Sequence, residues 1–146
     1  RIFKEFGDDP KARRLAREIL HRRERQPFAV SDDLVGAIRA VHGPRSGAPE
    51  FARIFQAVRI AVNDELGALD ALLRQLPEAL RPGGRVALLS FHSGEDRRVK
   101  KAFEAGLHQG LYAEIAREVV RPTPAERHDN PRSSPAKLRW ARKAAA

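Results

Sequence analysis

The chain has 146 residues, enough for one hydrophobic core or two small lobes, and it contains no cysteine, which excludes disulfides and thiolate metal sites. Its 28 Lys and Arg residues against 19 Asp and Glu residues give a formal net charge of +9. This charge favours a polyanionic partner such as RNA or DNA, although arginine-rich usage in a GC-rich genome would produce the same balance. No apolar run approaches the roughly 20 residues of a membrane-spanning helix, so we expect a cytoplasmic protein with no membrane partner.

Two amphipathic helices are predicted in the first 50 residues. Apolar residues at helical spacing predict a helix over residues 11–25 that ends at Gln26-Pro27. Ser31 is expected to cap a second helix, which stops at Gly43-Pro44. The Gly/Pro/Ser segment over residues 43–49 is a candidate boundary. It divides the chain into a helical lobe of residues 1–50 and a second part of residues 51–146.

A long helical pattern follows over residues 51–76. Its period places Glu65 on the apolar side, where a carboxylate is costly without a partner. Either Asn63 caps a fresh helix and resets the register, or Glu65 is buried and paired; we favour the break. The predicted buried face carries ten apolar residues, namely Phe51, Ile54, Phe55, Val58, Val62, Leu66, Leu69, Leu72, Leu73 and Leu76.

The next segment predicts a tight turn, a strand and a new helix. Pro82 ends the preceding helix, and Gly83-Gly84 suit a sharp reversal. Residues 86–91 form a short apolar run, as expected for a strand covered on both faces. Ser93 can cap the following helix, with Asp96 completing a capping box. Polar groups then lie at the carboxyl end of a strand, where open α/β sheets bind ligands.

The remainder of the chain predicts two further strands, which makes the fold class mixed α/β. The helix that follows Ser93 buries Val99, Ala102 and Phe103, and residues 106–112 are predicted as a loop. Residues 115–120 form the second predicted strand, and prolines mark a long connection after it. Residues 136–141 alternate as a strand, with Ala136, Leu138 and Trp140 on an apolar face and Lys137, Arg139 and Ala141 on a wet face.

The histidines and Ser93 are the candidates for catalysis or metal binding, and each can instead have a structural role. His92 and Ser93 are neighbours, and neighbours on a strand point to opposite faces, so they cannot act as a hydrogen-bonded dyad. His92 is either a substrate contact or a core contact at the strand tip. The five histidines share no metal-ligand spacing, so we predict no metal site.

Two polar sets are candidates for contact with RNA. Gln56, Arg59 and Asn63 share one stripe of a helix, which is either a solvated face or a substrate-side surface. The second set follows a helix start and continues near the end of the chain, where a solvated cationic face is the alternative to phosphate binding. It comprises Arg97, Arg98, Lys100, Lys101, Arg132, Lys137 and Arg139.

Three segments in register, residues 55–66, 82–98 and 130–139, carry a family resemblance. With them the chain resembles the C-terminal half of the bacterial small-subunit ribosomal RNA methyltransferases of the H family. These enzymes use S-adenosylmethionine to modify the exocyclic amine of a cytosine. The resemblance implies a helical insertion lobe plus the C-terminal part of a Rossmann-like class I methyltransferase sheet. One departure is Gly94, where the family usually carries a bulky apolar residue.

The resemblance also implies roles for this chain. It would help to position ribosomal RNA of the small subunit and form part of the pocket wall, with His92, Ser93 and Asn63 as pocket candidates. No G-x-G motif follows a strand, and Gly83-Gly84 precede one, so we expect the cofactor site to lie outside this chain and the chain alone to be inactive. A non-enzymatic basic RNA-binding module and a helical protein-interaction module are the alternatives. A half-built sheet would also leave an exposed edge for self-association.

Overall fold

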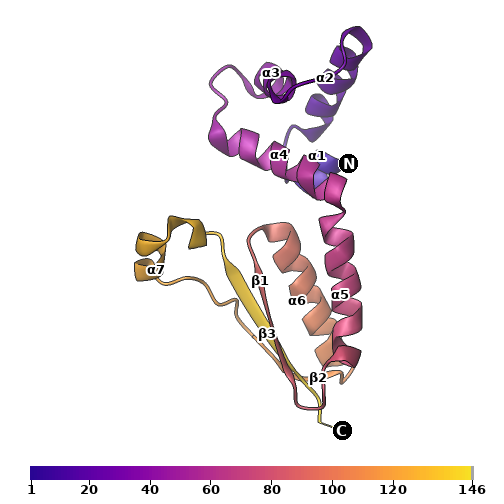
Figure 1. The fold of residues 1–146 in the computed structure, drawn as a ribbon, viewed down its shortest axis with the longest axis vertical. Helices are drawn as coiled ribbons and strands as arrows, with labels where there is room; N and C mark the ends of the chain where they lie inside the picture. The colour runs from indigo at the N-terminus through magenta and orange to yellow at the C-terminus, as the bar shows by residue number, and fades with distance from the viewer. Residues whose placement is uncertain (146) are drawn as a thin grey trace. The chain divides into compact units, whose positions relative to one another are not determined.

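A computed structural model describes residues 1–145 of the chain as two compact units (Figure 1). The first unit is Arg1–Glu65, and the second begins at Leu66. The division by compactness therefore falls at the interruption of the long helical segment. The division at residue 50, predicted from the Gly/Pro/Ser segment over residues 43–49, stays a prediction. No helix among the described residues is long and apolar enough to cross a membrane.

The first unit consists of four helices around a small apolar core. They are α1 (Ile2–Glu5), α2 (Ala12–Arg25), α3 (Ser31–His42) and α4 (Ala48–Asn63). The core is built from Leu15, Ala37, Ile38, Val41 and Ile54. The predicted helices over 11–25 and after residue 30 are confirmed, whereas the four-residue α1 is too short to show periodicity. The predicted cap was wrong by one residue, because Val30 precedes the helix and Asp33 accepts the backbone N–H of both Ala29 and Val30.

The long helical segment breaks at Asp64, as favoured from the sequence. Asp64 has a left-handed backbone with φ 49°, which ends α4 at Asn63 and lets α5 (Glu65–Ala79) begin. Glu65 is also paired, since its carboxylate accepts two hydrogen bonds from Arg59, at 2.8 and 3.1 Å, and one from Asn63. The helix break and the pairing of Glu65, which were alternatives from the sequence, therefore occur together. Val62, expected on the buried face, lies beside the break and is 78% exposed.

The second unit places two helices on one face of a three-stranded sheet (Figure 1). The strands β1 (Arg85–Ser90) and β2 (Tyr112–Ile115) both pair antiparallel with β3 (Lys137–Lys143), which lies between them. Because both outer strands oppose β3, β1 and β2 run parallel to each other, and α6 (Ser93–His108) connects them. A short α7 (Pro124–Asp129) and a 3₁₀ turn (Pro131–Ser133) precede β3.

The three predicted strands exist, but the second was misplaced. The structure has β2 at Tyr112–Ile115, and only Val120 of the later segment bridges to Leu138. Tyr112 is buried and its ring packs edge-on against Phe103, with centroids 5.5 Å apart. A Cβ at Gly106 would lie 2.5 Å from the Tyr112 ring, so this glycine is what admits the aromatic side chain. Residues 106–108 therefore belong to α6 and Tyr112 belongs to β2, so the predicted loop shortens to the turn over residues 109–111.

The predicted faces of β3 were reversed. Arg139 and Ala141, expected to be wet, are 8% and 0% exposed on the side that α5 and α6 cover. Their partners in register are Leu88 and Val86 of β1, which face the same core. The opposite face carries Leu89, Leu138 and Trp140, and Leu89 is 56% exposed. The expectation that β1 is covered on both faces was also wrong for the described residues, because burial alternates along it.

The uncovered apolar face predicts self-association of this chain. Exposed apolar side chains on a sheet favour association, and β1 lies at an edge of the sheet in the described chain. We therefore expect sedimentation equilibrium to detect dimers at tens of micromolar. Leu89→Lys should weaken that association at high salt. Leu20→Lys is the matched control, since Leu20 is 57% exposed on a helix of the other unit. A chain that stays monomeric, or a Leu20→Lys effect as large as that of Leu89→Lys, would contradict the expectation.

Candidate functional site

The tip of β1 is joined to α6 by only two residues, Phe91 and His92. His92 is the N-cap of α6, and its Nδ1 accepts the Glu95 backbone N–H at 3.3 Å. In return, Oε2 of Glu95 accepts the N–H groups of Phe91 and His92, at 3.0 and 3.4 Å. The predicted pairing of Ser93 with Asp96 was thus wrong by one residue. The reciprocal cap satisfies backbone donors at the helix start and fixes the strand tip.

The imidazole of His92 keeps one polar atom without a hydrogen bond. Since Nδ1 accepts a backbone hydrogen bond, the neutral ring carries its proton on Nε2. Nε2 is buried and lies 3.2 Å from Oε1 of Glu95, but in a geometry that makes no hydrogen bond. Gly94 gives the ring its space, because a Cβ there would lie 3.1 Å from Nδ1. Ser93 is exposed in the first turn of α6.

An ion pair fastens the first turn of α6 to the sheet. The guanidinium of Arg139 on β3 donates two hydrogen bonds to the carboxylate of Asp96, at 2.7 and 3.2 Å. The two side chains are only 10% and 16% exposed. The Arg139 hydrogen bond is the main cause that lowers the pKa of Asp96 below its usual value, with Lys137 and Arg121 contributing charge. The predicted contact of Arg139 with RNA stays a prediction, and in the structure its guanidinium is paired with Asp96.

The other predicted cations of this unit divide into paired and unpaired groups. Arg98 pairs with Asp70 at 3.3 Å, and Lys100 pairs with Glu104 at 3.7 Å. Four remain without a salt bridge among residues 1–145, and these are Arg97, Lys101, Arg132 and Lys137. The first three are exposed and Lys137 is half-buried. Fewer of the predicted cations are therefore without an ion-pair partner than the sequence suggested.

The predicted polar stripe of α4 belongs to the first unit. Arg59 and Asn63 both hold the carboxylate of Glu65, so their side chains secure the helix break. Gln56 is half-buried on the same helix, and its side chain makes no hydrogen bond in the described part of the chain. A substrate that contacts Arg59 or Asn63 would compete with their hydrogen bonds to Glu65.

Two buried polar groups were not anticipated from the sequence. The carboxylate of Asp9 is fully buried and meets His42 at 3.2 Å and Arg53 at 3.4 Å. Asp9 lies in the loop between α1 and α2, whereas His42 lies in α3 and Arg53 in α4, so sequence spacing gives no signal for the cluster. Ser133 is the second group, since its Oγ is buried without a hydrogen bond in the described chain. Among the described residues there is no group of three or more His, Cys, Asp or Glu that could hold a metal ion.

Comparison with known proteins matches the chain to one family. The model of the MraW methylase family matches residues 1–144. A protein of Gemmatimonas aurantiaca named ribosomal RNA small subunit methyltransferase H is 65% identical over 102 residues, covering 70% of this chain and 32% of that protein. Proteins of the same name from Crocosphaera subtropica and Rubrobacter xylanophilus are 41% and 44% identical, covering 97% and 96% of this chain. The chain spans 44% and 49% of their lengths.

The Asp96–Arg139 pair predicts a specific loss of stability at acidic pH. The pKa of Asp96 is lowered in the folded state. Its contribution to stability is therefore present above the usual aspartate pKa of 3.8 and is lost as pH falls through the folded pKa. Asp96→Asn should destabilise the chain by about 2–3 kcal/mol at neutral pH, because a buried guanidinium loses its charged partner.

Urea denaturation at neutral pH and near pH 3 measures this difference. We expect the difference in free energy of unfolding between Asp96→Asn and the unsubstituted chain to be smaller at the acidic pH. Asp33→Asn serves as a comparison at a half-buried capping carboxylate whose pKa is also lowered, by backbone hydrogen bonds from Val30 and Ala29. If that difference for Asp96→Asn is the same at both pH values, the stabilising role given to the Asp96–Arg139 pair is contradicted.

Proposed function

This chain belongs to the MraW methylase family, and from that membership we propose that a protein carrying it is an S-adenosylmethionine-dependent methyltransferase. Its substrate would be the exocyclic amine of a cytosine in small-subunit ribosomal RNA. The observation that carries the proposal is the family match along residues 1–144. The names of the relatives from three bacteria support ribosomal RNA as the substrate class. Such a substrate implies a cytoplasmic location.

The topology of the second unit supports the proposed architecture. Two parallel strands joined by α6, with the antiparallel β3 between them, suit the C-terminal end of a Rossmann-like methyltransferase sheet. The tip of β1 then lies at the carboxyl end of a parallel strand, where such sheets bind ligands. In this proposal residues 1–50 belong to a helical substrate-recognition insertion, and residues 51–146 belong to the methyltransferase α/β domain.

This chain would supply RNA positioning and part of the pocket wall. Methyl transfer to an amine requires the base to be lifted into a pocket and held in line with the donor. His92 is the first pocket candidate, and its Nε2, which is buried 3.2 Å from Oε1 of Glu95, makes no hydrogen bond in the described chain. Ser93 is a second candidate in the same unit, and Asn63 is a separate candidate in the first unit. The four unpaired cations would contact phosphates and fix the register of the RNA.

The residues present do not fit a cofactor cradle, so no chemical step is assigned to them. Gly83 and Gly84 lie before β1, where Gly83 has φ 70°. Their amides are already used, since Gly84 N–H donates to Arg81 at 2.8 Å and Gly83 N–H donates to Ala144. A Cβ at Gly84 would lie 2.8 Å from the Arg81 carbonyl oxygen, so this glycine serves a tight turn.

The test of the proposal is methyl transfer by the longer protein that carries this chain. Purified protein, labelled S-adenosylmethionine and small ribosomal subunits lacking the modification are combined. We expect label in the exocyclic amine of one cytosine, identified by nuclease digestion and mass spectrometry. Label on another base would reject the assignment of the cytosine amine. No label would reject the proposal and favour a non-enzymatic module that binds ribosomal RNA through its positive charge.

The isolated chain is predicted to bind S-adenosylmethionine too weakly for calorimetric detection. The physical reason is that its two adjacent glycines, Gly83 and Gly84, form a turn and their backbone N–H groups donate hydrogen bonds within the protein. Isothermal titration of the chain checks this expectation. Stoichiometric binding at micromolar cofactor would overturn it and would require a cofactor site of a different kind.

The unpaired cations predict a charge-dependent RNA affinity. Replacing both Arg97 and Lys101 by Ala should lower the slope of log affinity against log salt by about 0.7 for each charge on single-stranded RNA. Replacing Arg98 and Lys100 is the matched control with the same change in charge on the same helix. Because those two side chains are ion-paired, a smaller change in slope is expected. Equal changes for the two pairs would contradict the assignment.

A further inference from the structure

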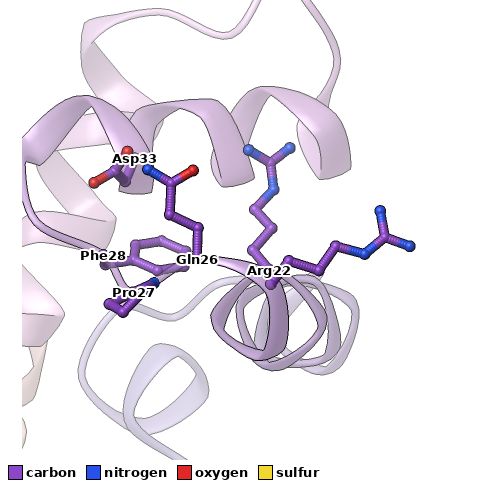
Figure 2. Close-up of a pocket in the computed structure, with 6 residues that line it drawn as sticks. Arg22, Gln26, Pro27, Phe28 and Asp33 are labelled. Carbon is purple, nitrogen blue, oxygen red and sulfur yellow. The ribbon is translucent and has the colours of Figure 1, made fainter.

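A small cavity lies in the first unit where α2 gives way to α3 (Figure 2). It has a volume of about 180 Å³, which gives room for one planar base. The cavity is far in sequence from the β1 tip, and none of its residues belongs to the sites described above. Six residues line it, and these are Arg22, Arg25, Gln26, Pro27, Phe28 and Asp33.

One wall of the cavity is an aromatic ring with a fixed position. Phe28 is half-buried and packs against the helical core of the first unit. The preceding Pro27 restricts the backbone at the entry to this segment. Figure 2 shows the Phe28 ring beneath the side chain of Gln26. A ring held in this way on a cavity wall is a stacking platform for a planar group.

The helix wall of the cavity carries two guanidinium groups. Arg22 uses Nε to pair with Glu18 at 2.7 Å, and its Nη1 lies 3.0 Å from the position of a Cβ at Gly36. The glycine on α3 therefore leaves the space in which this guanidinium sits. Arg25 is exposed and makes no salt bridge in the described chain. Of the fourteen residues in α2, six are arginine and two are glutamate, which extends positive charge along the helix.

The third wall carries both a hydrogen-bond acceptor and a hydrogen-bond donor. Asp33 accepts the N–H groups of Ala29 and Val30 at 2.7 and 2.9 Å, which lowers the pKa of its carboxyl and keeps it ionised. The amide of Gln26 extends toward Asp33 in Figure 2 and makes no side-chain hydrogen bond in the described chain. A carboxylate accepts hydrogen bonds from base amines, and an amide can donate as well as accept.

We propose that this cavity binds one unpaired nucleotide of an RNA, with the base stacked on Phe28, its amine-bearing edge toward Asp33 and Gln26, and its phosphate at Arg25 and Arg22. The proposal rests on the proposed function for RNA as the partner and adds a contact site in the first unit. An acidic peptide would satisfy the two arginines, but it would be repelled by Asp33 and would leave the Phe28 ring unused. A base with an attached phosphate uses all three walls.

The experiment measures RNA binding by this chain with two matched pairs of variants. The probe is a short unstructured RNA with a fluorescent end label, used alone and annealed to its complement. Phe28→Leu removes the aromatic ring, and Phe28→Tyr keeps it. Arg25→Ala removes a cavity cation, and Arg23→Ala removes an exposed arginine of the same helix end that does not line the cavity. Circular dichroism confirms that each variant keeps its helices.

We expect Phe28→Leu to weaken single-strand binding about tenfold or more, while Phe28→Tyr stays within about twofold and duplex binding is unchanged. Arg25→Ala should lower the salt slope by about 0.7, and Arg23→Ala should change it less. The inference is overturned if Phe28→Leu binds the single strand as tightly as the unsubstituted chain, or if Arg25→Ala and Arg23→Ala have equal effects. Polyglutamate binding that depends on Phe28 would overturn it in favour of an acidic protein partner.

The two proposals fail separately. Methyl transfer by the longer protein with no Phe28-dependent RNA binding would reject the nucleotide site alone. Phe28-dependent binding by a protein that transfers no methyl group would reject the proposed function and leave the nucleotide site in place.

Discussion

The ion pair between Asp96 and Arg139 is the constraint on which the second unit depends. It is nearly buried, with two hydrogen bonds between the same two groups, and it joins the first turn of α6 to the central strand of the sheet. A guanidinium on the covered face of a strand is costly unless a charged partner meets it. Asp96 meets that requirement from the turn that follows the β1 tip. The orientation of β3 and the position of the strand tip are therefore set together.

The orientation of β3 determines which surfaces the unit presents. With Arg139 turned toward the helices, Leu138 and Trp140 lie on the opposite face beside the exposed Leu89. The same arrangement leaves the His92–Glu95 cap as the structure at the tip of β1. The predicted cations that make no salt bridge in the described chain lie outside this pair, and these are Arg97, Lys101, Arg132 and Lys137. The first unit contributes its own arginine-rich helix with an aromatic cavity at its end.

Periodicity predicted the elements better than it predicted faces and caps. The helices and the strand after Gly84 follow from spacing and from Gly and Pro signals, which are local properties. The faces of β3 could not be predicted this way, because alternation of apolar and charged residues assigns Arg139 to water unless its distant partner is known. Tyr112 was placed in a loop for a similar reason, since its fit depends on Gly106 and Phe103. The cap of α6 differed by one residue because Asp96 is engaged by β3, which leaves Glu95 to reach back.

The most direct test of this account is amide hydrogen exchange in the chain with Arg139→Met, which keeps apolar volume on β3 and removes the charge. If the ion pair fixes the strand tip, the backbone N–H groups of Phe91, His92 and Glu95 should exchange markedly faster, because the first turn of α6 loses its attachment to the sheet. The backbone N–H of Phe103, which lies in the core, should keep its protection against exchange. Unchanged protection at all three tip residues would contradict the central role given to the Asp96–Arg139 pair.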